Sequence, residues 1–243
     1  MLNVLNRRWT PSATIALTAA LLIATQSPTR AAAPTSLKKG DRIVLLGDSI
    51  TAAGARKGGF ITIMRAVIDK KHPELKVKLI GAGISGHKVP DCQKRLQRDV
   101  IDKKPTIVFI YIGINDVWHS TRGRGTPKDI YEKGLRRMIA RINEAGGRVI
   151  LCTPSVIGER IDGANKLDAM LDEYSDISRK VARDTKSQML DLRKQFVDYL
   201  AKENKKANKN RGVLTRDGVH LNGPGNHFVA HRMLEALGIA AEK

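Results

Sequence analysis

RIVLLGDS, residues 42–49, is the stretch from which the organisation of this 243-residue sequence can be worked out. Residues 42–47 are rich in aliphatic and β-branched side chains, which predicts a buried strand, and the Gly-Asp pair at 47–48 predicts a tight turn. Ser49 therefore follows the carboxyl end of a strand directly. In an open α/β sheet this edge is where ligands bind.

Apolar runs bounded by turn residues alternate, along the rest of the chain, with segments of helical spacing. The further strands are predicted at residues 76–80, 106–112, 148–153 and 188–192. The helices are predicted at residues 60–71, 89–102, 127–144, 167–185 and 225–237. Strands that alternate with helices pair in parallel through right-handed crossovers. The sequence therefore predicts an α/β fold, a three-layer α/β/α sandwich around a central, mostly parallel five-stranded sheet.

A leader-like segment precedes the first strand. Arg7 and Arg8 come before an apolar run at residues 15–24, and small residues follow at 31–33. This pattern is typical of a secretory signal peptide, predicted as residues 1–33, and implies export to the periplasm or the extracellular space. No later run approaches the roughly 20 apolar residues that cross a bilayer, so no integral membrane segment is expected after cleavage. Residues 34–243 are predicted to form a single domain, because their number suits one core.

The composition is strongly basic. The net charge of +19 becomes +16 without the three arginines of the predicted leader, and such a charge could favour acidic polysaccharide, anionic lipid or nucleic acid. A general contribution to solubility is the other interpretation. Aromatic residues make up only 4% of the chain and are scarce for base stacking, so no nucleic-acid partner is predicted. The oligomeric state is left open.

Two cysteines, Cys92 and Cys152, are too few for a disulfide framework even in an exported protein. Cys152 lies in the apolar run 148–153, which predicts that it is a small buried hydrophobic residue. Whether the two cysteines are paired stays open at this point.

Residues with side chains suited to catalysis follow three of the predicted strands and occur again near the end of the chain. The segments are GDSI at 47–50, GAGISG at 81–86, GIND at 113–116 and DGVHL at 217–221. Because the carboxyl ends of parallel strands meet at one edge of a sheet, these segments are expected to converge on one cleft.

A serine hydroxyl needs an adjacent base to act as a nucleophile, and that base needs a third group to orient it. Ser49 is the candidate nucleophile and His220 the candidate base. Asp217, three residues before His220, can turn its carboxylate back to Nδ1 of the imidazole and leave Nε2 free to face Ser49.

Attack on an ester carbonyl places negative charge on its oxygen, and preset hydrogen-bond donors stabilise that charge. Asn115 offers a side-chain amide after the third strand. Gly86 offers a backbone N–H that can approach closely, because glycine has no side chain. The N–H of Ser49 completes a predicted oxyanion hole of three donors.

These four segments, in this order, resemble the four sequence blocks of the SGNH (GDSL-type) hydrolases, and the resemblance extends from residue 41 to residue 237. It implies a flavodoxin-like fold of the SGNH hydrolase type and ester hydrolysis without a metal or a cofactor. It assigns the triad to Ser49, Asp217 and His220, and the oxyanion hole to Ser49, Gly86 and Asn115. One departure is Gly81, where many members have asparagine; it is expected to alter local turn geometry rather than the catalytic set.

The function implied is that of a serine esterase working through an acyl-enzyme. Because no hydrophobic lid segment is visible, the expected substrate is a small-molecule or polysaccharide ester with a short acyl group, such as acetyl on carbohydrate. A lysophospholipase or lipase-type acylhydrolase is the alternative. A basic glycan-binding protein without catalytic activity is a second alternative, from a different class.

Four other features compete with this interpretation. GAGISG fits the dinucleotide pattern G-x-G-x-x-G, but it does not open on the first strand and lacks the acidic residue at the end of the next strand. His227 and His231 have zinc-ligand spacing without the glutamate of H-E-x-x-H, so no metal is predicted.

Residues 118–127, with Trp118 and two arginines, are predicted as a loop over the site that binds sugar and an anionic group, or as an ordinary exposed loop. The basic stretch 202–211 is interpreted as a solvated flexible loop or as a steering surface for acidic substrates.

Overall fold

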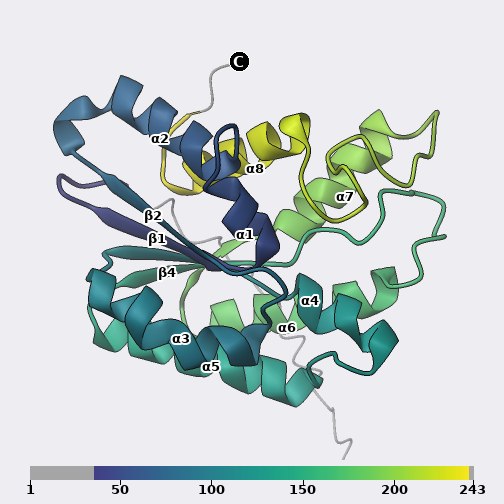
Figure 1. Cartoon of the computed structure of the whole chain (residues 1–243), viewed down its shortest axis with the longest axis horizontal. Coiled ribbons are helices and arrows are strands. Elements are labelled where there is room, and N and C mark those ends of the chain that lie inside the picture. Colours follow the sequence, from purple (N-terminus) through teal and green to yellow (C-terminus); the bar gives the residue numbers. More distant parts are fainter. Residues whose placement is uncertain (1–35, 241–243) are drawn as a thin grey trace, which may run out of the picture. The chain divides into compact units, whose positions relative to one another are not determined.

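The computed structural model describes residues 36–240, in which parallel strands alternate with helices (Figure 1). The predicted signal peptide, residues 1–33, lies outside the described residues. The strands are β1 (Arg42–Gly47), β2 (Lys78–Gly83), β3 (Ile107–Tyr111), β4 (Arg148–Cys152) and β5 (Gln188–Leu190). They form one sheet in the order β2-β1-β3-β4-β5, and every neighbouring pair is parallel. This is the flavodoxin-like strand order, and it confirms the predicted class of sheet.

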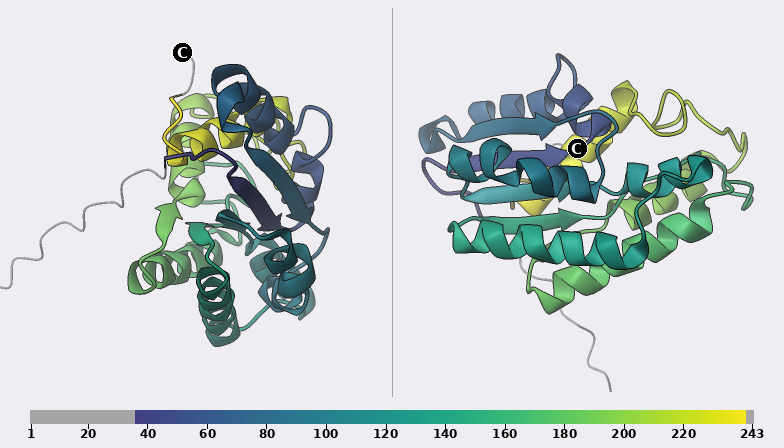
Figure 2. Two further views of the ribbon diagram at one scale, coloured as in Figure 1. Left: turned by 90° about the vertical axis from the view of Figure 1, so that its left-hand side faces the viewer. Right: turned by 60° about the horizontal axis from the view of Figure 1, so that its bottom comes forward.

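Helices cover both faces of the sheet, as the views along and across the strands show (Figure 2). One layer contains α1 (Ser49–Gly54), α2 (Phe60–Lys71), α7 (Leu192–Glu203) and α8 (Gly223–Ala236). The other contains α3 (Val89–Asp99), α4 (Ile114–Trp118), α5 (Lys128–Glu144) and α6 (Asp168–Asp184). Short 3-10 turns lie at Pro73–Leu75, Ile101–Lys103 and His119–Arg122. The three-layer α/β/α prediction is therefore confirmed.

The central strand β3 is buried along its whole length, between β1 and β4. Its sequence, IVFIY, has no polar side chain that faces solvent, which is what a strand covered by helices on both faces requires. Cys92 and Cys152 are both buried and unpaired. The prediction of Cys152 as a small buried hydrophobic residue is thus confirmed. Within residues 36–240, none of the helices combines the length and the apolarity needed to cross a membrane.

The second strand differs from its prediction. It was expected at residues 76–80 with the glycines after it, but β2 begins at Lys78 and includes Gly81 and Gly83, paired with β1 up to Gly47. The glycines are there because α1 crosses close to the strand: a Cβ on Gly83 would lie 2.2 Å from the backbone nitrogen of Ala52. Two of the three glycines of GAGISG thus serve helix packing inside a strand rather than a phosphate-binding turn.

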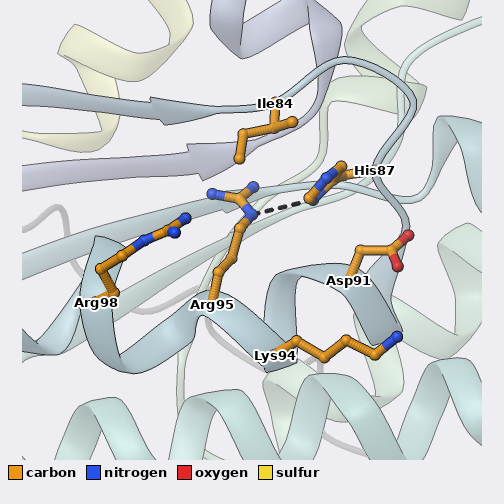
Figure 3. A pocket seen from close by; sticks show the side chains of 6 residues that line it. All are labelled: Ile84, His87, Asp91, Lys94, Arg95 and Arg98. Atoms are coloured by element: carbon orange, nitrogen blue, oxygen red, sulfur yellow. Dashed lines mark hydrogen bonds between the residues drawn. The ribbon is translucent and has the colours of Figure 1, made fainter.

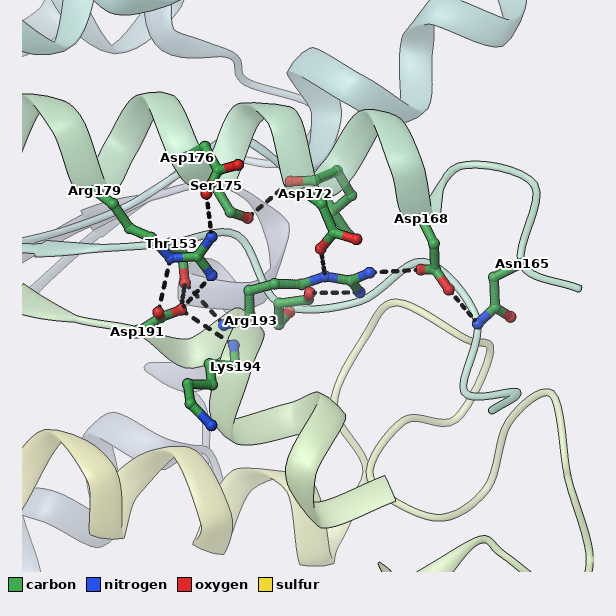
Figure 4. A network of polar contacts seen from close by, with 12 residues as sticks. Thr153, Asn165, Asp168, Asp172, Ser175, Asp176, Arg179, Asp191, Arg193 and Lys194 are labelled. Atoms are coloured by element: carbon green, nitrogen blue, oxygen red, sulfur yellow. Dashed lines mark hydrogen bonds and ion pairs between the residues drawn. The ribbon is translucent and has the colours of Figure 1, made fainter. Parts of the chain in front are cut away.

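Helix α7 was not predicted, and a polar network fixes it (Figure 4). Asp191 caps the helix by accepting a hydrogen bond from the N–H of Lys194, and it also pairs with Arg179 of α6 at 2.8 Å. Arg193, in the first turn of α7, is buried and pairs with Asp168 and Asp172 of α6 at 2.9 and 2.7 Å. Ion pairs that bind α7 to α6 across the end of β5 are long-range contacts that local sequence patterns do not reveal.

Candidate active site

Ser49 is the first residue of α1 and follows β1 after a two-residue turn. Asp48 caps the helix: its Oδ1 accepts the N–H of Ile50 at 2.9 Å. Gly47 must be a glycine, because a Cβ there would lie 2.1 Å from Oγ1 of Thr51. The chain therefore changes from strand to helix within two residues and leaves the Ser49 side chain partly exposed at the carboxyl edge of the sheet.

A continuous line of hydrogen bonds joins the three residues of the predicted triad. Oγ of Ser49 lies 2.9 Å from Nε2 of His220, and Nδ1 of His220 lies 2.8 Å from Oδ2 of Asp217. The sequence separation between Ser49 and His220 is 171 residues, so the fold itself brings them together. This is the geometry in which an imidazole, oriented by a carboxylate, can take a proton from a serine hydroxyl.

The Asp217–His220 turn is closed on itself. Thr215 and Leu221 form an isolated antiparallel bridge around it, and the N–H of Arg216 donates to the carbonyl of His220 at 2.8 Å. Oδ1 of Asp217 accepts the backbone N–H of His220 at 2.7 Å, while its Oδ2 faces the imidazole. The two side chains therefore share one small rigid turn.

The pKa of Asp217 is held below its ordinary value. Partial burial alone would raise the pKa, but hydrogen bonds from the N–H of His220, from its imidazole and from the N–H of Val219 outweigh that effect. A carboxylate that accepts this many hydrogen bonds stays ionised at neutral pH. It can thus stabilise a protonated imidazole beside it.

Sequence reasoning missed Glu159, which binds the backbone just before the Asp217–His220 turn. This glutamate is fully buried, and its carboxylate accepts the backbone N–H groups of Val213, Leu214 and Thr215 at 2.8, 2.7 and 2.5 Å. Its own carbonyl accepts a hydrogen bond from the side chain of Asn204. Glu159 lies outside all four sequence blocks, so only the folded chain reveals its connection to the turn that carries Asp217.

The predicted oxyanion donors Gly86 and Asn115 are linked through His87, which follows Gly86 and accepts a hydrogen bond from Asn115. Gly86 lies in a turn with φ +77°, a conformation that favours glycine. Among the described residues, the backbone N–H groups of Ser49 and Gly86 have no hydrogen-bond acceptor. Asn115 is buried and donates one Nδ2 hydrogen to the carbonyl of His87 at 3.0 Å, which leaves the other hydrogen for a ligand.

His87 links this turn to α3. Its Nδ1 accepts a hydrogen bond from Nε of Arg95 at 3.1 Å, so the ring hydrogen lies on Nε2 (Figure 3). Burial and the neighbouring Arg95 lower the pKa of His87. Arg95 also donates to the carbonyls of Ala82 and Gly47, both at 2.8 Å. One buried guanidinium thereby ties the Gly86 turn to the ends of β1 and β2.

Two buried carboxyl groups lie behind the site. Burial raises the pKa of Asp48 to about 7, and the nearby Asp116 adds to the shift. Burial also raises the pKa of Asp116 to about 6, although its carboxylate accepts the N–H of Val89 at 3.1 Å. Asp48 lies between the end of β1 and Ser49, and Asp116 lies in α4 directly after Asn115, so each is a sequence neighbour of a predicted site residue.

The raised pKa of Asp48 predicts a pH-dependent stability difference for Asp48→Asn. Since the folded protein binds this proton more tightly than the unfolded chain, stability falls as pH rises from about 4 to about 7 and the loss then stays constant. Asparagine keeps an acceptor for Ile50 and avoids the loss. Urea unfolding should therefore give the variant a gain over wild type that is up to about 4 kcal/mol larger at pH 8.5 than at pH 4. An equal difference at both pH values would contradict the assignment.

The segment predicted as a loop over the site is partly helical. Trp118 is the last residue of α4 rather than part of a loop, and a 3-10 turn, His119–Arg122, follows it. The indole of Trp118 meets the imidazole of His220 edge-on, with ring centroids 6.3 Å apart. The expectation that this segment borders the site thus agrees with the geometry, although its secondary structure was predicted wrongly.

The competing features lie elsewhere. His227 and His231 are neighbours on α8, with ring centroids 6.4 Å apart, and no group of three or more potential ligands forms within residues 36–240. The stretch 202–211 begins in the last turn of α7, and Asn204 holds its start by hydrogen bonds to the backbone of Glu159 and Lys209. That stretch is therefore fixed at one end to the same glutamate that anchors the Asp217 turn.

This strand order, with a hydrogen-bonded serine, histidine and aspartate at the carboxyl edge of the sheet, defines the class of serine hydrolases with a three-layer fold. Residues 45–228 match the model of the GDSL-like Lipase/Acylhydrolase family, and the chain belongs to this family and is a carboxylic ester hydrolase. The resemblance to SGNH hydrolases inferred from four short segments is confirmed.

Individual relatives cover most of the chain. An acetylxylan esterase of Geobacillus stearothermophilus is 29% identical over 218 residues, which span 82% of this chain and 94% of that protein. The isoamyl acetate-hydrolyzing esterase 1 homolog of Rattus norvegicus is 28% identical over 207 residues, 77% of this chain and 78% of that protein. The crystal structure of the acetyl xylan esterase AlAXEase superposes with a TM-score of 0.78 at 45% identity and covers 81% of this chain and 99% of its own.

Proposed function

We propose that this protein is an exported esterase that removes acetyl groups from carbohydrate, with Ser49 as nucleophile, His220 as general base and Asp217 as the group that orients it. The observation that carries the assignment is the hydrogen-bonded line from Ser49 to His220 to Asp217, at 2.9 and 2.8 Å. Export rests on the predicted leader at residues 1–33.

The reaction begins when Oγ of Ser49 attacks the carbonyl carbon of the ester and His220 takes the hydroxyl proton on Nε2. Collapse of the tetrahedral intermediate breaks the bond to the alcohol, which leaves with the proton from His220. The acetyl group stays on Ser49. Water then attacks this acyl-enzyme with His220 again as base, and acetate leaves.

Charge on the tetrahedral oxygen would be stabilised by three donors: the backbone N–H groups of Ser49 and Gly86, and Nδ2 of Asn115. The two backbone groups have no other acceptor among the described residues, and Asn115 has one hydrogen to spare. Donors that are already fixed in place need no reorganisation when the charge develops. The buried links from Arg95 and His87 support that rigidity.

The preference for acetyl has two supports. The relatives are named for esters of different alcohols, xylan and isoamyl alcohol, and acetate is the part that these names share. In addition, four large hydrophobic side chains are exposed within residues 36–240: Trp118, Ile130, Ile161 and Val197. Ile161 and Val197 line a pocket that also includes Arg193, whereas the indole of Trp118 meets the triad residue His220 and offers a flat face suited to a sugar ring.

Acyl-chain preference tests this assignment. We expect kcat/KM on p-nitrophenyl esters to fall by at least about tenfold between acetate and hexanoate, because a site built for acetyl has no room for added methylenes. Acetate should also be released from acetylated xylooligosaccharides. A rate that rises with chain length would favour the lysophospholipase or lipase alternative, and no turnover of any ester would leave the glycan-binding alternative.

A further inference from the structure

The rim of the site next to Trp118 is strongly basic. Arg122 and Arg124 lie on the segment that leaves α4, and both side chains are exposed. Nζ of Lys88 reaches across to the carbonyl of Arg124 at 2.9 Å. Since Lys88 comes two residues after Gly86, this hydrogen bond joins the oxyanion turn to the basic segment. We call Lys88, Trp118, Arg122 and Arg124 the basic rim.

The arginines of the basic rim have no carboxylate partner among residues 36–240. Other arginines do bind carboxylates: Arg136, Arg179 and Arg193 each bind two. Unpaired guanidinium groups at the edge of an active site remain available for an anion from outside. A guanidinium presents parallel N–H donors that match the two oxygens of a carboxylate.

The pKa of His119 shows that all three cations of the basic rim act on one neighbouring group. Burial lowers the pKa of His119, and Lys88, Arg124 and Arg122 lower it further, while Asp91 raises it. His119 is therefore neutral at neutral pH and the rim carries three cations. Asp91 reduces the field only in part, because it is one carboxylate against three cations.

The cavity beside the oxyanion turn suits an anion less well (Figure 3). It has a volume of about 370 Å³ and is lined by Ile84, His87, Asp91, Lys94, Arg95 and Arg98. Arg95 and Arg98 both pair with Asp99, at 3.1 and 2.6 Å, and Asp91 adds a negative charge to the wall. Its two arginines therefore already share a carboxylate within the protein, whereas Arg122 and Arg124 bind none among the described residues.

We propose that the basic rim binds a carboxylate group of the glycan that carries the acetyl ester, as in a uronic acid substituent. The inference rests on the proposed acetylesterase function. The indole of Trp118, 6.3 Å from the imidazole of His220 and partly exposed, offers a flat apolar face for the sugar ring next to the reacting ester. Arg122 and Arg124 then meet the carboxylate of a neighbouring sugar.

The test compares two acetylated xylooligosaccharides with the same backbone, one neutral and one with a uronic acid substituent. For wild type we expect kcat/KM to be at least about fivefold higher on the acidic substrate at low salt. In the double variant Arg122→Gln/Arg124→Gln the ratio should fall to about one. The activity of every variant on p-nitrophenyl acetate is measured in parallel.

A matched control removes two charges far from the site: Lys78→Gln/Arg148→Gln, at the exposed amino ends of β2 and β4. This control should keep the ratio of wild type. Equal loss in both double variants would assign the preference to net charge and overturn the proposal, as would a wild-type ratio of one. Binding to phosphatidylglycerol vesicles that needs Arg122 and Arg124, together with a ratio of one, would point to a lipid surface instead. If wild type does not hydrolyse p-nitrophenyl acetate at all, that result contradicts the proposed esterase function and not the proposal about the basic rim.

Discussion

Ser49→Ala should lower kcat on p-nitrophenyl acetate by on the order of 10⁴-fold or more, with the fold unchanged. Without Oγ there is no atom to form the acyl-enzyme, and the base at 2.9 Å has no proton to take. Alanine is tolerated at the first position of a helix, so α1 should form as before. Steady-state kinetics with near-UV circular dichroism measures both effects.

The control for this variant is Ser187→Ala. Ser187 precedes β5 at the opposite edge of the sheet, where its hydroxyl meets Thr185, so the activity should stay within about twofold of wild type. A double variant Ser49→Ala/His220→Ala should be scarcely slower than Ser49→Ala alone, because the two residues act as one unit. Activity that survives Ser49→Ala would refute the assignment of the nucleophile.

Glu159→Ala should destabilise the protein by on the order of 3–5 kcal/mol. The change leaves two buried N–H groups, those of Leu214 and Thr215, and the partly buried N–H of Val213 without their acceptor. Each unsatisfied buried donor costs about 1–3 kcal/mol, and solvent that enters the space recovers part of this. For a domain of this size the melting temperature should fall by roughly 10 °C. Thermal unfolding and kinetics on p-nitrophenyl acetate are measured together.

The effect of Glu159→Ala on catalysis should exceed its effect on substrate binding. The residue touches no substrate and acts by positioning the turn of Asp217 and His220, so kcat should fall more than KM rises even well below the melting temperature. Glu144→Ala, an exposed glutamate at the end of α5, is the matched control and should change stability by less than about 0.5 kcal/mol. A normal kcat for Glu159→Ala would show that the buried carboxylate does not position Asp217 and His220 for catalysis.

The fold was largely predictable because its elements are strongly patterned. The continuous apolar run of β3 and the helical spacing of α5 and α6 need no tertiary context, and their predicted bounds lie within two residues of the observed ones. The end of β2 was missed because glycine is poor in strands, and only the close approach of α1 explains why it is there. Helix α7 was missed although Leu192, Phe196 and Leu200 have helical spacing, because the predicted strand 188–192 was extended over its cap and first residue.

For the candidate site, too, some residues were accessible to sequence reasoning and others were not. Ser49, Asn115, Asp217 and His220 are candidates that the sequence supplies, because each follows a strand or lies in a short block of recognisable type, and hydrogen bonds join three of them in the folded chain: Ser49, His220 and Asp217. Glu159 and Arg95 could not be predicted, because their importance lies in backbone groups that they bind far away in sequence. Nothing in their local sequence distinguishes them from other charged residues.

Because the turn around Asp217 and His220 is closed on itself, the triad consists of two rigid parts, this turn and the start of α1. The acid and the base move as one body, since Asp217 binds both the backbone and the ring of His220 within three residues. The serine moves with the other, at the start of α1. Catalysis then depends on how these two bodies and the oxyanion donors are placed relative to one another, and the separation of Oγ and Nε2 reports one part of that placement. Sequence drift in the outer helices is tolerated for as long as that placement is kept.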